Sequence, residues 1–253
     1  MEKSARQAWM RQAEFDSIIL SSGAIGFFAD PVEIKKGVFS SFYINWRTVA
    51  SDAFLLDKVT DLIIDFIGHS ALRPSSIYGV PDGATKWGIV SQLKWARLQK
   101  DFAQGAYSVP MGRSAPKAHG MPQDRMFVGM PRGPTVIIED VVVEGEALLN
   151  SIRLLRDAKV NVVAAIVLTD RNEKSKGARS VGDEVEAMGI KYFAMSNATE
   201  LVPAAFSMSG RRGIIAKSIE KEYAERGAAK MPSLGAALQR PCADERKGAG
   251  KAN

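Results

Sequence analysis

One stretch of the sequence, residues 135–150, restricts the fold more than any other. Its first four residues, Thr135–Ile138, are β-branched and favour a strand, and the acid pair Glu139-Asp140 follows directly. A short turn around Gly145 then leads into an apolar and polar pattern over residues 147–158 that predicts an amphipathic helix. A strand, an acidic tip, a glycine turn and a helix N-terminus form the layout in which α/β proteins bind phosphorylated ligands.

Helical and strand patterns alternate along the rest of the chain, which predicts an α/β fold with a parallel sheet covered on both faces. We find no repeats and expect a single domain over residues 1–230. The expected strands are 76–80, 135–138, 160–169 and 191–195, with a hairpin at 30–47; the expected helices are 4–27, 52–68, 86–100, 147–158, 178–188 and 213–226.

Two further segments carry polar and glycine residues where a ligand site is expected. The turn Gly79–Lys86 joins a strand to a helix, so its backbone N–H groups and Lys86 are candidates for binding an anion. Residues 105–131 hold many Gly, Pro, Lys and Arg residues and predict a mobile functional loop. Residues 231–253, rich in Gly, Ala, Lys and Arg, predict a disordered tail.

Composition excludes several classes of protein. The content of 46% hydrophobic and 25% charged residues is that of a globular protein, and we expect neither a membrane span nor a signal peptide. The single cysteine, Cys242, excludes internal disulfides and a cysteine-rich zinc site, and we expect a cytoplasmic location. The net charge of +6 suits anionic ligands, but no motif predicts binding to nucleic acid.

The stretch 135–150 resembles the phosphoribosyl pyrophosphate (PRPP) motif of the type I phosphoribosyltransferases. Glu139 and Asp140 match the two acids of that motif, and Gly145 matches the glycine of its loop. The loop otherwise departs from the pattern, because Glu144 and Glu146 stand where the family has small and hydroxyl residues around a 5′-phosphate. The fold that the resemblance implies is a type I phosphoribosyltransferase-like parallel sheet flanked by helices, with a small N-terminal hood in residues 1–50.

The two loop glutamates have an electrostatic consequence. A dianion about 6 Å from one carboxylate meets about 5 kcal/mol of repulsion at an effective dielectric of about 20, before solvent screening. Glu144 and Glu146 could point outward, one of them could occupy the anion site as a helix cap, or either could bind a ribose hydroxyl of a donor without a 5′-phosphate. The sequence leaves these three alternatives open.

Three more segments resemble the orotate phosphoribosyltransferases in particular. The segment 34–45 resembles the amino-terminal segment of that family, which implies that Lys35 reaches the pyrophosphate or the base and that Phe42 and Tyr43 flank the pyrimidine. The segment Thr169–Glu173 resembles the part whose arginine binds the carboxylate of orotate, which implies this role for Arg171.

The third segment, Arg113–Gly120, resembles the flexible catalytic loop of the family. On this resemblance Lys117 and Arg113 stabilise the pyrophosphate leaving group, and His119 is a further contact of the loop. The loop has no apolar pattern that would bury His119 in a core. We therefore expect the polar residues of this loop to bind a ligand and not to have a structural role.

The family resemblance implies an enzyme that joins orotate or a related base to PRPP and releases pyrophosphate, in pyrimidine nucleotide synthesis. The acids Glu139 and Asp140 would stabilise the oxocarbenium-like ribose, and Mg²⁺ would bind mainly through PRPP, without a dedicated protein metal site. A homodimer is implied, in which the loop serves the partner's site. The alternative is a non-catalytic protein of the same fold, a ligand sensor or partner subunit whose phosphate loop has decayed.

Overall fold

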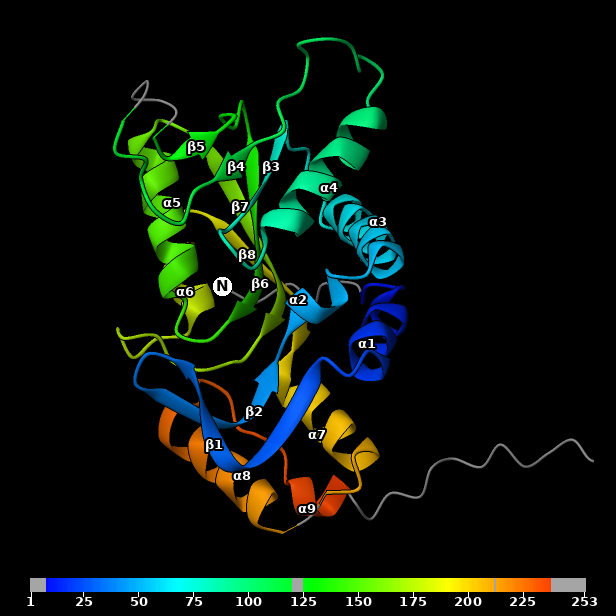
Figure 1. Ribbon diagram of the computed structural model, residues 1–253, viewed down its shortest axis with the longest axis vertical. Helices are drawn as coiled ribbons and strands as arrows, with labels where there is room; N and C mark the ends of the chain where they lie inside the picture. Colours follow the sequence, from blue (N-terminus) through cyan, green and yellow to red (C-terminus); the bar gives the residue numbers. More distant parts are fainter. Residues whose placement is uncertain (1–7, 120–124, 212, 238–253) are drawn as a thin grey trace, which may run out of the picture.

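The computed structural model describes residues 8–119, 125–211 and 213–237. At its centre is a parallel four-stranded sheet in the order β3-β6-β7-β8. Helices cover both faces, as the alternation predicts (Figure 1). The strands are β3 (Ser76–Gly79), β6 (Thr135–Val142), β7 (Val162–Asp170) and β8 (Lys191–Asn197). One face of the sheet is covered by α1 (Gln12–Ser21), α3 (Ala53–His69) and α4 (Thr85–Arg97). The other face is covered by α5 (Glu146–Asp157) and α6 (Val181–Ala187).

An antiparallel hairpin lies beyond the carboxyl ends of the sheet strands (Figure 1). It consists of β1 (Ile25–Lys35) and β2 (Val38–Ile44) and is followed by α2 (Trp46–Val49). Three helices, α7 (Ala198–Met208), α8 (Ile214–Arg226) and α9 (Leu234–Ala237), lie near the hairpin on the side away from the sheet. We call β1 and β2 the hood, because they correspond to the N-terminal hood that the sequence predicts.

A second, much smaller hairpin lies at the opposite end of the sheet from the hood (Figure 1). Its strands are β4 (Met111–Gly112) and β5 (Phe127–Val128), which pair antiparallel. The hairpin carries residues 113–119 of the predicted catalytic loop, while the last residue of that loop, Gly120, lies outside the described residues.

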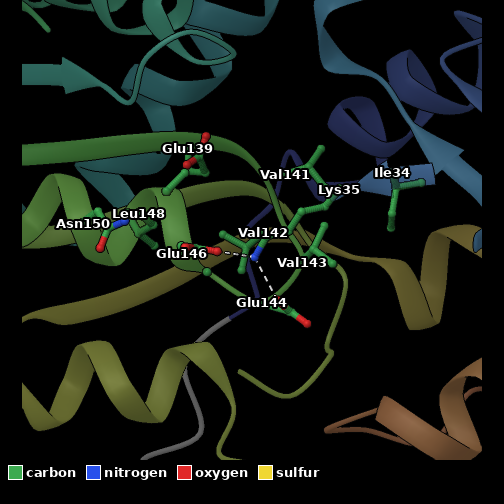
Figure 2. Close-up of a pocket in the computed structure, with 12 residues that line it drawn as sticks. Ile34, Lys35, Glu139, Val141, Val142, Val143, Glu144, Glu146, Leu148 and Asn150 are labelled. Carbon is green, nitrogen blue, oxygen red and sulfur yellow. Dashed lines mark hydrogen bonds and ion pairs between the residues drawn. The ribbon is translucent and has the colours of Figure 1, made fainter. Parts of the chain in front are cut away.

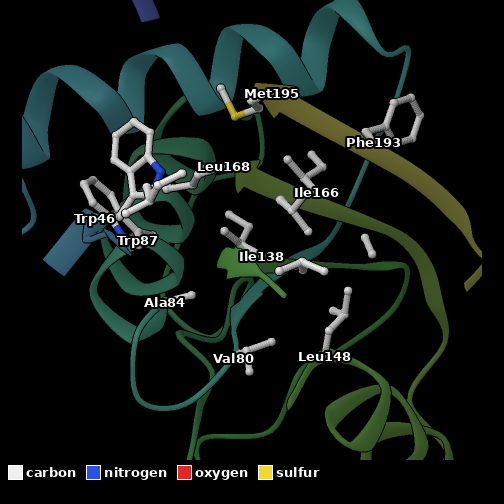
Figure 3. Close-up of a cluster of buried hydrophobic side chains, with 14 of the residues drawn as sticks. Trp46, Val80, Ala84, Trp87, Ile138, Leu148, Ile166, Leu168, Phe193 and Met195 are labelled. Carbon is white, nitrogen blue, oxygen red and sulfur yellow. The ribbon is translucent and has the colours of Figure 1, made fainter. Parts of the chain in front are cut away.

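The core fixes the hood to the sheet. Trp46, directly after β2, is fully buried, and its ring meets that of Trp87 from α4 edge-on, with 5.9 Å between the ring centroids. Its indole Nε1 donates a hydrogen bond of 2.8 Å to Thr169 Oγ1 at the end of β7. These contacts continue the apolar layer of Ile138, Ile166 and neighbouring side chains between sheet and helices (Figure 3).

The structure differs from the sequence predictions in three segments outside the site. The helix predicted over 4–27 ends at Ser21, because Gly23 takes a left-handed conformation (φ 70°), and strand β1 starts two residues later. Helix α7 was not predicted; it continues through Pro203, a residue that usually ends a helical pattern. In the described part of the chain, no helix combines the length and apolar character needed to span a bilayer.

The third correction concerns the predicted tail. Met231 and Leu234 are buried, and α9 contacts α7 and α8, so residues 231–237 are an ordered part of the fold. The rest of that tail, residues 238–253 with Cys242, lies outside the described residues.

Candidate active site

Strand β6 continues through the two acids of the central motif to Val142, past its predicted end at residue 138, and the two acidic side chains lie on opposite faces of the strand. Side chains alternate along a strand, so Glu139 lines a pocket next to α5 while Asp140 lines a second pocket next to the hood. Burial, together with the charge of Asp140, raises the pKa of Glu139 well above its ordinary value. The site therefore places a carboxyl group with a raised pKa beside one that faces a cation, since Arg47 Nε lies 3.9 Å from Asp140 Oδ2.

The turn between β3 and α4 lies directly against Asp140. A Cβ atom added to Gly83 would lie 2.5 Å from Asp140 Oδ2, so a glycine is required for this approach. The neighbouring Val80 N–H donates to Ile138 O of β6 at 2.9 Å, which holds the turn beside the strand end. The turn thus lies beside Asp140, but its residues are not part of the lining of either of the two pockets.

The pocket on the hood side is small, about 100 Å³, and we call it the arginine pocket. Arg171 enters it from the end of β7, next to Asp140, because the register pairs Val142 with Asp170. Its lining is Ile34, Tyr43, Ile44, Arg47, Asp140, Val141, Val143 and Arg171.

Arg171 is 1% exposed and has several partners. Its Nε donates to Glu173 Oε1 at 2.7 Å, and its two terminal nitrogens donate to Ser40 Oγ at 3.0 Å and to the carbonyl of Phe42 at 3.4 Å. A guanidinium has five N–H donors, so these three bonds leave two for a ligand in the pocket. The ion pair with Glu173 is therefore compatible with a second, ligand-binding role.

A closed ring of charges surrounds this arginine. Glu173 is 1% exposed and also accepts from Arg226 Nε at 2.8 Å, while Arg226 pairs with Glu222 at 2.8 Å. Glu222 completes the ring by accepting from Ser40 Oγ at 2.7 Å. The ring joins the hood, the end of β7 and α8, so that α8 helps to fix the position of Arg171.

Of the two neighbouring aromatic residues of the hood, Tyr43 lines a pocket and Phe42 lies in the core. Tyr43 lines the arginine pocket, where the sequence places it. Phe42 is fully buried instead, with the guanidinium carbon of Arg171 3.9 Å from its ring centre and the ring of Tyr223 stacked at 6.2 Å. Phe42 therefore supports Arg171 from behind and does not line either pocket.

The pocket on the α5 side has a volume of about 410 Å³, and we call it the loop pocket. Gly145 is the N-cap of α5 and has φ 73°, a left-handed conformation that favours glycine, as the turn in the sequence predicts. Lys35 does not reach towards the arginine pocket; its Nζ lies 2.8 Å from Glu144 Oε2 and 2.5 Å from Glu146 Oε2 (Figure 2). The lining is Ile34, Lys35, Glu139, residues 141–148 and Asn150.

The other predicted cations lie away from these two pockets. Backbone N–H groups of Arg113 and Lys117 donate to Met126 O and Arg125 O, which keeps this segment beside β5 at the far end of the sheet. His119 is exposed on the same segment. Lys86 Nζ donates to the carbonyl of Ala50 at 3.2 Å, near α2. Within the single described chain, therefore, these four cations do not meet the acid pair.

Sequence reasoning missed two parts of the site. Arg47 lies beside Asp140, and its Nη2 donates to Tyr43 Oη at 3.3 Å. In the sequence Arg47 was only the last residue of the predicted hairpin and matched no motif. Glu222 and Arg226 come from a helix that carries no motif. Among the described residues, no group of three or more His, Cys, Asp or Glu side chains is arranged to hold a metal ion.

The fold and the acid pair together define the class of protein. A structural neighbour, orotate phosphoribosyltransferase of Francisella tularensis, superimposes with a TM-score of 0.61 at 16% identity, covering 85% of this chain and 99% of that one. The structure of Leishmania donovani UMP synthase gives a TM-score of 0.63 at 18% identity, covering 85% of this chain and 42% of that one. The fold is that of a type I phosphoribosyltransferase.

Sequence comparison narrows the class to one family. An orotate phosphoribosyltransferase of Thioalkalivibrio sulfidiphilus is 32% identical over 195 residues, which are 76% of this chain and 86% of that protein. Its counterpart in Aeropyrum pernix is 28% identical over 165 residues, 64% of this chain and 78% of that protein. No family model matches the chain. The chain belongs to the orotate phosphoribosyltransferase family.

Proposed function

We propose that this protein transfers the phosphoribosyl group of PRPP to orotate, releasing pyrophosphate and forming orotidine 5′-monophosphate in pyrimidine nucleotide synthesis. The observation that carries the proposal is the meeting of Asp140 and Arg171 in one pocket, at the ends of adjacent parallel strands of a fold shared with that family. Orotate needs a cation for its carboxylate, and PRPP needs carboxylates near its ribose.

Each group then has a role set by its place. The two spare N–H donors of Arg171 bind the carboxylate of orotate, with Tyr43 beside the ring of the base. Asp140 binds the ribose hydroxyls and stabilises positive charge on the ribose as the bond to pyrophosphate breaks. Glu139, on the opposite face of β6, contacts the ribose from the side of the loop pocket.

The pyrophosphate lies over the turn that contains Gly83, whose backbone borders Asp140. Mg²⁺ fits this arrangement, because it binds through one or two carboxylates and the phosphates of a substrate and does not need a protein cage. It would supply positive charge at the pyrophosphate. Lys86 is proposed to assist at the same end of the turn.

The missing cations come from a second copy of the chain in our proposal. Arg113, Lys117 and His119 follow β4, at the far end of the sheet from the pockets (Figure 1). In a homodimer, this segment of one protomer would reach the pyrophosphate bound to its partner, where Lys117 and Arg113 would stabilise the leaving group. We propose a cytoplasmic enzyme with no nucleic-acid or membrane partner.

Mixing two inactive variants tests both the reaction and the shared site. Lys117→Ala removes a loop cation and Asp140→Asn removes a ribose contact, so each homodimer is expected to be inactive. Random reassociation makes about half of the dimers mixed, and each mixed dimer has one intact site out of two. About a quarter of wild-type activity is therefore expected to return. If the mixture stays inactive while wild type converts orotate, the loop acts within its own protomer.

One observation favours a second candidate function. The salt bridges of Lys35 with Glu144 and Glu146 fill the mouth of the loop pocket, as expected in a ligand sensor or partner subunit whose phosphate loop has decayed, or in an enzyme whose donor lacks a 5′-phosphate. Such a protein would bind orotate without converting it in the presence of PRPP. Equilibrium binding of orotate in parallel with the turnover assay separates the two candidates.

A further inference from the structure

A cluster of four charges joins the hood to the loop after β6. Lys35 Nζ, from the end of β1, contacts the carboxylates of Glu144 and Glu146 at 2.8 and 2.5 Å (Figure 2). Lys176 Nζ contacts Glu146 at 3.4 Å. We call Lys35, Glu144 and Glu146 the clamp. The clamp connects residues 109 positions apart in the sequence and lines the loop pocket.

The clamp and Lys176 together are electrically balanced. Burial lowers the pKa of Lys35, but hydrogen bonds to Glu144 and Glu146 outweigh this effect and leave its pKa raised. The bond to Lys35 lowers the pKa of Glu146. With Lys176 included, two cations therefore face two carboxylates at neutral pH, and the loop pocket offers no net positive charge to an incoming anion.

The position of the clamp coincides with an anion-binding element. Glu144 and Glu146 flank Gly145, the N-cap of α5, where the helix dipole and the unpaired backbone N–H groups favour negative charge. The N-cap residue Gly145 has no side chain that could cap this N-terminus. The carboxylates of Glu144 and Glu146 bind Lys35 beside this helix N-terminus.

Lys35 is within reach of both the carboxylates and a ligand. It is 28% exposed, against 23% for Glu144 and 46% for Glu146, so the clamp lies at the mouth of a pocket of about 410 Å³ and not in the core. Breaking a partly exposed ion pair costs little compared with breaking a buried one. An anion that binds the amides of α5 can thus compete for the lysine.

We propose that Glu144 and Glu146 are an internal substitute for the 5′-phosphate of the ribosyl donor, and that the donor binds by displacing them from Lys35. This inference rests on the proposed function and deepens it, since it assigns Lys35 to the 5′-phosphate of the donor. The clamp then sets donor affinity: in the free protein it holds the hood against the loop, and in the complex the phosphate bridges Lys35 and the amides of α5.

Calorimetric titration of ribose 5-phosphate, PRPP and pyrophosphate into the full-length protein tests the exchange. In Glu144→Gln/Glu146→Gln, Lys35 has no competing anion, so ribose 5-phosphate and PRPP are expected to bind at least tenfold more tightly. Pyrophosphate, which lacks the 5′-phosphate, is expected to bind within about twofold of wild type. Lys35→Met is expected to weaken both phosphorylated sugars by tenfold or more.

Two controls make the result specific. Glu225→Gln removes one carboxylate from the exposed face of α8, where its side chain is 65% exposed, and reports the effect of net charge alone. If the double variant does not fold, the single variant Glu146→Gln, at the more exposed of the two glutamates, replaces it in the titration. A smaller gain in affinity for ribose 5-phosphate and PRPP is expected from this variant.

The inference is overturned if the clamp variants bind ribose 5-phosphate as wild type does or more weakly, or if no variant binds it. It is also overturned if wild type prefers a ribosyl ligand with a free 5′-hydroxyl. Failure of the proposed function looks different: tighter binding of ribose 5-phosphate by the double variant, with no conversion of orotate by wild type, would leave the clamp exchange standing without the reaction.

Discussion

Removing Glu173 is expected to destabilise the whole protein and not only the arginine pocket. Its carboxylate is 1% exposed and accepts hydrogen bonds from Arg171 Nε at 2.7 Å and Arg226 Nε at 2.8 Å. In Glu173→Ala, the guanidinium of Arg171 stays buried at 1% exposure without its carboxylate. Breaking a buried ion pair in this way costs about 3–5 kcal/mol, because a charge is left uncompensated.

Thermal and urea unfolding measure this loss. For a domain of this size, about 3–5 kcal/mol corresponds to a fall in Tm of about 6–20 °C. The matched control is Glu225→Ala, whose carboxylate is 65% exposed and lies 3.8 Å from Lys221; it is expected to change stability by less than about 0.5 kcal/mol. A loss below about 1 kcal/mol in Glu173→Ala would refute the idea that the ring of charges holds Arg171 in place.

Two further predictions concern the acid pair. Burial raises the pKa of Glu139 above 4.5, so the folded state binds this proton more tightly than the unfolded state does. The free energy of unfolding therefore falls as the pH rises from the pKa of Glu139 in the unfolded state to its pKa in the folded state. Glu139→Gln is therefore expected to unfold at a higher temperature than wild type at neutral pH, with a difference that shrinks towards pH 4; a constant difference would contradict this. Gly83→Ala places a Cβ 2.5 Å from Asp140 Oδ2 and is expected to lower kcat/KM with PRPP at least tenfold, whereas wild-type kinetics would show that the turn can move.

Local patterns in the sequence were enough to predict much of the fold. The β-branched run of β6, the glycine turn and the amphipathic pattern of α5 each lie within one short stretch, and the structure confirms all three. The helix predicted from residue 52 begins with Asp52 as its cap, since the carboxylate accepts from the N–H of Leu55 at 2.8 Å. Family resemblance added the hood and the order of the motifs.

The missed parts of the site depend on contacts between distant segments. Lys35 meets Glu144 across 109 positions, and Arg226 meets Glu173 across 53, so neither pair leaves a local pattern. Phe42 was expected beside the base because its neighbours match a family motif. Successive side chains point to opposite faces of β2, however, so Tyr43 lines the pocket and Phe42 lies on the other face, in the core. In our proposal the loop cations meet the acid pair of a second protomer, a contact that leaves no pattern within one chain.

The most direct test of the account is the loss of orotate absorbance in the ultraviolet when the protein is mixed with orotate, PRPP and Mg²⁺. We predict conversion to orotidine 5′-monophosphate, with stoichiometric release of pyrophosphate, and a fall of at least a hundredfold in kcat for Lys117→Ala. The absence of conversion by a folded wild-type protein that still binds orotate would contradict the account and favour a ligand-sensing role for the same pocket.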